Sequence, residues 1–117
     1  MIRYIAVLRR RPGSTTEEFL AAWLGEHRAL ASALPHVRSV LFQPTANVPG
    51  IDQAYDGVGF LDFDSVEDLR RSLASEEALA LRAHTATFAE PGSAVRVVVD
   101  PGLGSAPERP RRPTESS

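Results

Sequence analysis

The sequence predicts a single α+β domain in which an antiparallel four-stranded sheet carries its helices on one face. Three observations support this prediction. The chain has 117 residues, of which 43% are hydrophobic and 24% are charged, as expected for one globular domain. Strand-like and helix-like segments follow one another in the order β-α-β-β-α-β. The chain has no cysteine, so its core forms without disulfides or cysteine-bound metal.

The first two elements are a strand over residues 2–9 and a helix over residues 15–34. The strand is rich in β-branched residues and ends before the turn signal Pro12-Gly13. Thr15 and Glu18 have the spacing of a capping box, which satisfies two backbone donors at a helix start. The apolar residues of this helix fall on an arc of about 140°. Pro35 ends it.

The remaining elements are strands over residues 36–43, 57–63 and 94–100, and a helical region over residues 65–84 that breaks near Ala74-Ser75. A loop from Pro44 to Asp56 joins the second and third strands. It is long for a connection, and such loops often serve as lids or binding arms. The last strand is apolar on both faces, which predicts a central or covered position in the sheet.

This element order is that of the ferredoxin-like fold, with both helices on one face of the sheet. The other face is expected to be apolar because it carries Ile5, Val7, Val97 and Val99. A monomer rarely exposes such a patch, so the sequence predicts a homodimer that pairs sheet to sheet. Residues 101–117 are rich in proline, glycine and serine without an aromatic residue, and are expected to form a disordered tail.

Composition excludes several classes of function. A net charge of -2 gives no reason to expect nucleic acid or an anionic membrane as partner. No apolar run approaches the roughly 18 residues of a membrane span, and the N-terminus lacks the pattern of a signal peptide, so the expected location is cytoplasmic. Motifs for phosphate binding or a hydrolase elbow are missing. The three histidines lack metal-ligand spacing, so no metal is expected.

Two histidines are candidate catalytic residues. His27 lies near the middle of the apolar arc, so its imidazole should point at the sheet, where burial favours the neutral form that acts as a base. The alternative is a structural histidine that bonds a backbone carbonyl. His84 lies one helical turn before Phe88 and either faces inward or is a surface histidine near a helix end.

Asp62 is the third candidate catalytic residue. It shares one face of the third strand with Phe60 and Val58, where a carboxylate needs a partner or water. In a catalytic role it would orient an imidazole or act as an acid or base. The structural alternative is an ion pair with an arginine such as Arg38 or Arg96. A set of aromatic residues is expected to shape a substrate pocket: Trp23, Tyr4, Phe42, Phe60, Phe63 and Phe88.

Several motifs, in their order and spacing, resemble the EthD family. They are Arg9-Arg-Arg-Pro-Gly13, Thr15-x-Glu17-Glu-Phe19, Trp23-x-x-x-His27-x-x-Leu30, Tyr55-Asp-Gly-Val58 and Phe63-Asp-Ser65-x-Glu67-Asp68. The resemblance covers nearly all of residues 1–100. It implies a dimeric α+β barrel of two ferredoxin-like subunits, each with a pocket between sheet and helices. It also implies an active-site role for His27, which matches the histidine of the family's W-x-x-x-H motif.

The resemblance implies a cofactor-independent enzyme, because families of this kind include lactone isomerases and polyketide cyclases or dehydratases. The expected substrate is a hydrophobic, carbonyl-rich metabolite, with His27 moving a proton and His84 or Asp62 assisting. Two alternatives remain open: a non-catalytic dimer that binds an apolar metabolite, and a cofactor-free oxygenase. The chain departs from the family at three positions, since His84 stands where an acidic residue is common, Phe60 where a glutamate is common, and Asp62 where an aromatic residue is common.

Overall fold

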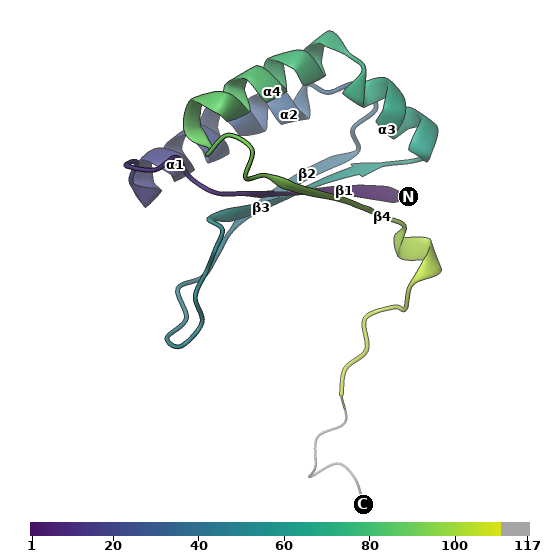
Figure 1. Ribbon diagram of the computed structural model, residues 1–117. Helices are drawn as coiled ribbons and strands as arrows, with labels where there is room; N and C mark the ends of the chain where they lie inside the picture. The colour runs from purple at the N-terminus through teal and green to yellow at the C-terminus, as the bar shows by residue number, and fades with distance from the viewer. Residues whose placement is uncertain (111–117) are drawn as a thin grey trace, which may run out of the picture.

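The computed structural model describes residues 1–110, and its centre is a four-stranded antiparallel sheet. The strands are β1 (Ile2–Leu8), β2 (Ser39–Pro44), β3 (Gly57–Phe63) and β4 (Val95–Val99). They lie in the order β2-β3-β1-β4, and every neighbouring pair is antiparallel. The helices that follow β1 and β3 lie together on one face of this sheet (Figure 1). The predicted ferredoxin-like fold is confirmed.

The first helical region runs from Thr16 to Ser32 and changes its hydrogen-bonding pattern in the middle. It consists of α1 (Thr16–Ala22), a π-helical segment η1 (Trp23–His27) and α2 (Arg28–Ser32). The capping box predicted at its start is present, with reciprocal hydrogen bonds between Thr15 and Glu18. The π segment was not predicted, and such segments often occur at functional sites.

The second helical region is broken where the sequence predicts. Helix α3 (Val66–Leu73) ends at Ala74, and α4 (Glu76–Phe88) begins after Ser75, whose hydroxyl accepts the backbone N–H of Ala78. Helix α4 continues past the expected end at residue 84, so it passes over the π segment of the first helix. This extension places His84 in the interior of a helix instead of at its end.

Strand β4 corrects one prediction, because it is an edge strand and not a central one. Its apolar residues do not indicate burial within the chain, since Val95 and Val97 are 40% and 44% exposed. Both face away from the helices, beside the β1 residues Val7 and Ile5. The bare face of the sheet therefore carries an uncovered apolar strip, as the sequence predicts.

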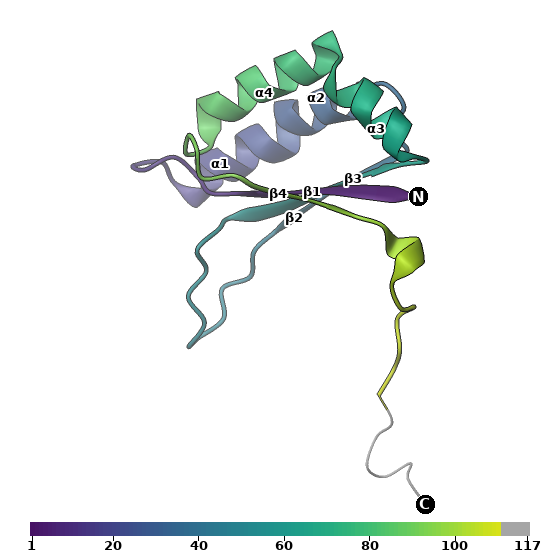
Figure 2. The ribbon, with the colours of Figure 1, turned by 45° about the vertical axis from the view of Figure 1, so that its right-hand side comes forward.

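The connection between β2 and β3 forms an arm that extends from the sheet on the side away from the helices (Figure 2). A β-bridge between Val48 and Ile51 closes its tip. After β4 the chain makes one 3-10 turn, η2 (Pro101–Leu103), and residues 104–110 have no regular structure. The rest of the predicted tail, residues 111–117, lies outside the described residues. Within residues 1–110, no helix has the length and apolar character needed to cross a membrane.

Two clusters of buried side chains lie between the sheet and the helices. One is centred on Phe63, Leu61 and Ala31, and the other on Phe19, Trp23 and Phe88. Phe42 packs against both clusters. The space between the clusters is not filled by side chains, and it forms the pocket described next.

Candidate functional site

A pocket lies between the helix-covered face of the sheet and the helices above it. The cavity itself has a volume of about 70 Å³ and is open to solvent at its mouth. The sheet contributes small residues to the middle of its floor, Ala6 from β1 and Gly59 from β3, and the helices contribute Ala31 and Ala78. Small side chains at these positions leave room that larger residues would fill. The lining is mostly apolar, and His27 projects into it.

The π segment presents Trp23 and His27 to the pocket, one near each of its ends. Both are buried, with exposed fractions of 1% and 6%. The His27 ring packs edge-on against Phe88, with ring centres 4.9 Å apart, and lies 5.9 Å from Phe42. An imidazole surrounded by aromatic rings has little access to water. The predicted inward orientation of His27 agrees with this arrangement.

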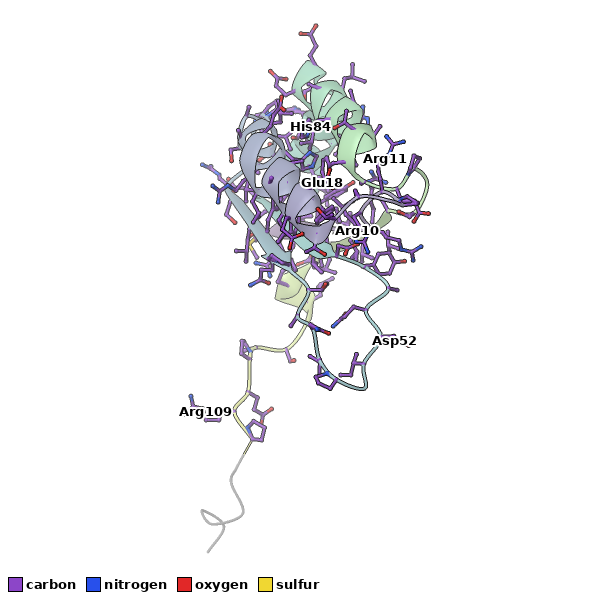
Figure 3. The ribbon with its side chains drawn as sticks, turned by 90° about the vertical axis from the view of Figure 1, so that its left-hand side faces the viewer. Arg10, Arg11, Glu18, Asp52, His84 and Arg109 are labelled. Carbon is purple, nitrogen blue, oxygen red and sulfur yellow. The ribbon has the colours of Figure 1, made fainter. Side chains whose placement is uncertain are left out.

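His27 and His84 contact each other directly. Nδ1 of His27 lies 3.1 Å from Nδ1 of His84, and the two rings stack with centres 5.3 Å apart. Figure 3 shows His84 on α4, and the contact places its ring toward the first helical region. Nε2 of His84 lies 3.2 Å from a carboxylate oxygen of Glu26. The three side chains thus form a chain that begins at an exposed carboxylate and ends at a buried imidazole.

Burial is the main influence on the electrostatics of His27. Burial and, to a smaller extent, the charge of the nearby His84 together lower the pKa of the imidazole from 6.5 to about 4. The charged form is disfavoured because the aromatic surroundings replace water. His27 is consequently neutral at pH 7 and has one nitrogen without a proton. Among residues 1–110, its side chain forms a hydrogen bond through Nδ1 to His84 and none through Nε2.

Trp23 and Phe42 form one wall of the pocket. Their rings stack almost parallel, with centres 4.8 Å apart and 2° between planes. The indole occupies the space above Gly57, where an added Cβ would lie only 2.4 Å from a ring carbon. Phe42 similarly leans over Gly59, with 3.1 Å to an added Cβ. These two glycines of β3 allow the aromatic wall to approach the sheet backbone.

Asp62 lies on the opposite face of the sheet from His27, so the two do not meet within one subunit. It forms a two-pronged ion pair with Arg3, at 2.8 and 3.2 Å, and accepts the hydroxyl of Ser39 at 3.0 Å. The hydrogen bond from Arg3 holds the pKa of Asp62 below its ordinary value. Asp62 therefore pairs with an arginine, as one of the two predictions for it stated. The partner is Arg3, however, and not Arg38 or Arg96.

The other predicted pocket residues divide by their strand face. Tyr4, like Trp23 and Phe42, lines the pocket. Phe60 does not, because side chains alternate along a strand and Phe60 shares the face of Asp62, where it stacks under Arg3. Phe63 is fully buried in the core. Phe88 stands behind the two imidazoles without lining the cavity.

Sequence reasoning missed Glu26 and gave no site role to Arg82 or Thr85, both on α4 and both lining the pocket. Glu26 precedes His27 directly and lies outside the apolar arc, so nothing in the periodicity indicated a contact with the second helical region. The signal was the unusual inward histidine at position 84, which needs a polar partner. In the described part of the chain, no group of three or more ligand side chains is suited to hold a metal ion.

Comparisons with known proteins agree with this geometry. A family model described as the EthD domain matches residues 11–92. The chain belongs to the EthD family. The match includes the π segment, the arm and helix α4, so it covers most of the pocket's residues. The resemblance expected from the sequence motifs is confirmed. A search of curated protein sequences finds no match.

Solved structures show the same fold at low sequence identity. An EthD family protein from Bacillus halodurans is 16% identical, with a TM-score of 0.72 over 86% of this chain and 98% of its own. A dimeric ferredoxin-like protein of unknown function from Thermobifida fusca is 21% identical, with a TM-score of 0.61 over 84% and 88%. The cofactor-independent oxygenase SnoaB from Streptomyces nogalater is 12% identical, with a TM-score of 0.62 over 96% of each chain.

Proposed function

We propose that this EthD family protein is a cofactor-independent enzyme in which His27 moves a proton next to a carbonyl group of a hydrophobic metabolite. The observation that carries the proposal is the chain of Glu26, His84 and His27, which ends at an apolar pocket. A buried, neutral imidazole with a free nitrogen in a pocket fits the role of a general base.

The hydrogen bonds indicate which ring nitrogen of each histidine carries the proton. A carboxylate only accepts hydrogen bonds, so Glu26 holds the Nε2 proton of His84. When His84 carries only this proton, its Nδ1 is bare and accepts the Nδ1 proton of His27. This leaves the lone pair of His27 on Nε2. A carboxylate and a histidine together therefore set the tautomer of the base, in the manner of a catalytic triad.

The proposed reaction consists of two proton transfers. Nε2 of His27 takes a proton from the carbon beside the carbonyl, which leaves an enolate and an imidazolium. The imidazolium then returns the proton, either to a departing hydroxyl in a dehydration or to another carbon in an isomerisation. An enolate formed in this way also attacks a second carbonyl in a cyclisation. A positioned base typically contributes about 10²- to 10⁴-fold to such a rate.

We further infer that the working form is a homodimer paired through the bare sheet face. Support comes from the uncovered apolar strip of β1 and β4 and from the description of similar structures as dimeric. Covering such a strip removes apolar surface from water. Asp62 and Phe60 would then lie at the dimer interface and not in the pocket.

The test is metabolite profiling of a deletion strain complemented with wild type, His27→Ala or His36→Asn. His36 is a matched control because it is exposed, does not line the pocket, and has a positive φ of 67° that asparagine also tolerates. We expect an intermediate to accumulate that wild type and His36→Asn clear and His27→Ala does not. If His27→Ala clears it equally well, His27 is structural and the non-catalytic binding alternative gains support.

A cofactor-free oxygenase is the second candidate, favoured by the shared fold with SnoaB. In that reaction the carbanion formed by His27 reacts with molecular oxygen, so that a CH₂ group and O₂ give a carbonyl group and water. Turnover of the accumulated intermediate with and without oxygen separates the two reactions. Product formation under nitrogen supports the lyase or isomerase, whereas a strict need for oxygen supports the oxygenase.

A further inference from the structure

One row of residues crosses the floor of the pocket from edge to edge. In the strand register, Phe42 lies opposite Gly59, Gly59 opposite Ala6, and Ala6 opposite Arg96. All four line the pocket. Strands are spaced by about 4.8 Å, so the row spans roughly 14 Å between its outer Cα atoms. Its middle is small and flat, one end is aromatic and near His27, and the other end carries a guanidinium group.

The charges of the pocket are of one sign. Its lining contains Arg82 from α4 and Arg96 from β4, and no aspartate or glutamate. Within residues 1–110, neither guanidinium forms an ion pair, whereas those of Arg3, Arg9 and Arg38 all pair with carboxylates. Arg82 has only a long hydrogen bond of 3.4 Å to the carbonyl of Leu73. Both arginines are exposed, so they bring positive charge to the rim of an apolar pocket, and no carboxylate among residues 1–110 pairs with them.

We propose that the pocket selects a flat, apolar organic acid, whose anionic group lies between Arg82 and Arg96 and whose reacting carbon lies toward His27. Guanidinium groups recognise carboxylates through paired hydrogen bonds, which makes arginine suited to this task. The inference rests on the proposed function because it names the substrate class for the same pocket.

An anionic substrate also suits the chemistry of His27. In the empty pocket, burial disfavours the imidazolium and holds the pKa of His27 near 4. A bound anion adds negative charge to the same cavity, which raises that pKa toward the range in which a base is most effective. The groups in contact with the His27 ring are His84 and the aromatic rings of Phe42 and Phe88, and Glu26 contacts His84 on its far side. The substrate is therefore the main new charge on the pocket side of the imidazole.

The chain contains its own reporter of binding. Trp23 is the sole tryptophan, it lines the pocket, and it stacks on Phe42. We would titrate the full chain at pH 7 with biphenyl-4-carboxylate and with biphenyl-4-carboxamide, following Trp23 fluorescence. The two probes have nearly the same shape and differ in charge. We expect the acid to bind at least 10-fold more tightly than the amide.

Three variants test which residues cause the preference for the acid over the amide. Arg82→Gln with Arg96→Gln should bring the affinity of the acid down to that of the amide and leave the amide unchanged. Arg28→Gln with Arg70→Gln removes the same charge from outside the pocket lining and should keep the preference. Ala6→Ile fills the floor and should weaken both probes. Equal affinity of acid and amide for wild type, a preference that survives in the first variant, or full binding by Ala6→Ile would each overturn the proposal.

The outcome is separable from that of the proposed function. His27→Asn should bind the acid with its preference intact, because His27 is placed at the reacting carbon and not at the anion. If wild type binds acid and amide equally but its turnover depends on His27, only the proposed substrate class is contradicted. An acid preference without any His27-dependent turnover contradicts only the catalytic role.

Discussion

Nδ1 of His27 lies 3.1 Å from Nδ1 of His84, so a hydrogen bond joins the two helical regions above the sheet. Of the two nitrogens in this contact, only one can carry the proton, and in the proposed arrangement Glu26, at the far side of a singly protonated His84, places it on His27. A hydrogen bond between two neutral imidazoles would otherwise have no preferred direction. The exposed carboxylate of Glu26 therefore influences the protonation pattern of a residue that is 6% exposed.

The first prediction concerns the pH dependence of stability. The pKa of His27 falls from 6.5 to about 4 on folding, so between these values the unfolded chain binds more protons than the folded one. The contribution of His27 is complete above pH 6.5 and is lost as the pH falls toward 4. The loss amounts to at most about 3 kcal/mol. Denaturant unfolding at a series of pH values, at one protein concentration, measures it.

The difference between wild type and His27→Gln isolates this effect from other titrating groups. The carboxylate of Asp62 has a pKa below its ordinary 3.8 and loses its contribution only at lower pH in both proteins. We expect the free energy of unfolding to fall less steeply between pH 6.5 and 4 in His27→Gln. Parallel curves for the two proteins would mean that His27 titrates normally in the folded state.

The second prediction is that Glu26→Gln changes the tautomer of His27. An amide both donates and accepts, so it no longer requires the proton to be on Nε2 of His84. Nitrogen NMR should show His27 protonated at Nδ1 and His84 at Nε2 in wild type, and mixed tautomers in the variant. Glu77→Gln removes an exposed carboxylate from the same helix as His84 and should leave both tautomers as they are. An unchanged spectrum for Glu26→Gln would assign the tautomers to some other contact.

The fold was predictable because it depends on local signals that the structure retains. The capping box at Thr15, the cap at Ser75 and the period-two pattern of β3 each determine an element without help from distant residues. The position of β4 was not predictable in the same way. Its valines indicate contact with an apolar surface. The sequence of one strand does not indicate whether that surface belongs to the same chain or to another copy.

The site was predictable only where one helix face determines it. His27 follows from the apolar arc of a single helix, and Trp23 lies one turn before it. The contacts of His27 and Glu26 with His84 depend on how two helical regions pack, which the pattern of one helix does not contain. Asp62 was assigned to a strand face correctly, but alternation along a strand does not indicate which face the helices cover.

The third prediction is that Asp62 serves the structure and not the pocket. Asp62→Asn removes the charge that Arg3 pairs with, and Asp62 is 8% exposed. We expect the free energy of unfolding to fall by about 1–3 kcal/mol and the affinity for pocket ligands to stay within twofold. Equilibrium unfolding and the Trp23 titration measure the two effects. A variant of full stability that no longer clears the intermediate would return Asp62 to the catalytic residues.

The fourth prediction uses two glycines with opposite surroundings. At Gly57 an added methyl group would lie 2.4 Å from the indole of Trp23, which is 1% exposed. At Gly25, within the π segment, nothing lies within 4 Å. Gly57→Ala should therefore displace Trp23, cost about 1–3 kcal/mol and shift the tryptophan fluorescence.

Gly25→Ala should be neutral or stabilising by up to about 1 kcal/mol, because alanine favours a helix over glycine. Paired denaturant curves and emission spectra of the two variants measure these effects. An alanine at position 57 has no intrinsic cost in a strand, so its destabilisation reports the contact alone. If Gly57→Ala is as stable as wild type with an unshifted spectrum, Trp23 is not packed against β3, and the wall of the pocket must be placed elsewhere. If Gly25→Ala is the more damaging variant, the π segment depends on its glycine, and the position of His27 depends on it too.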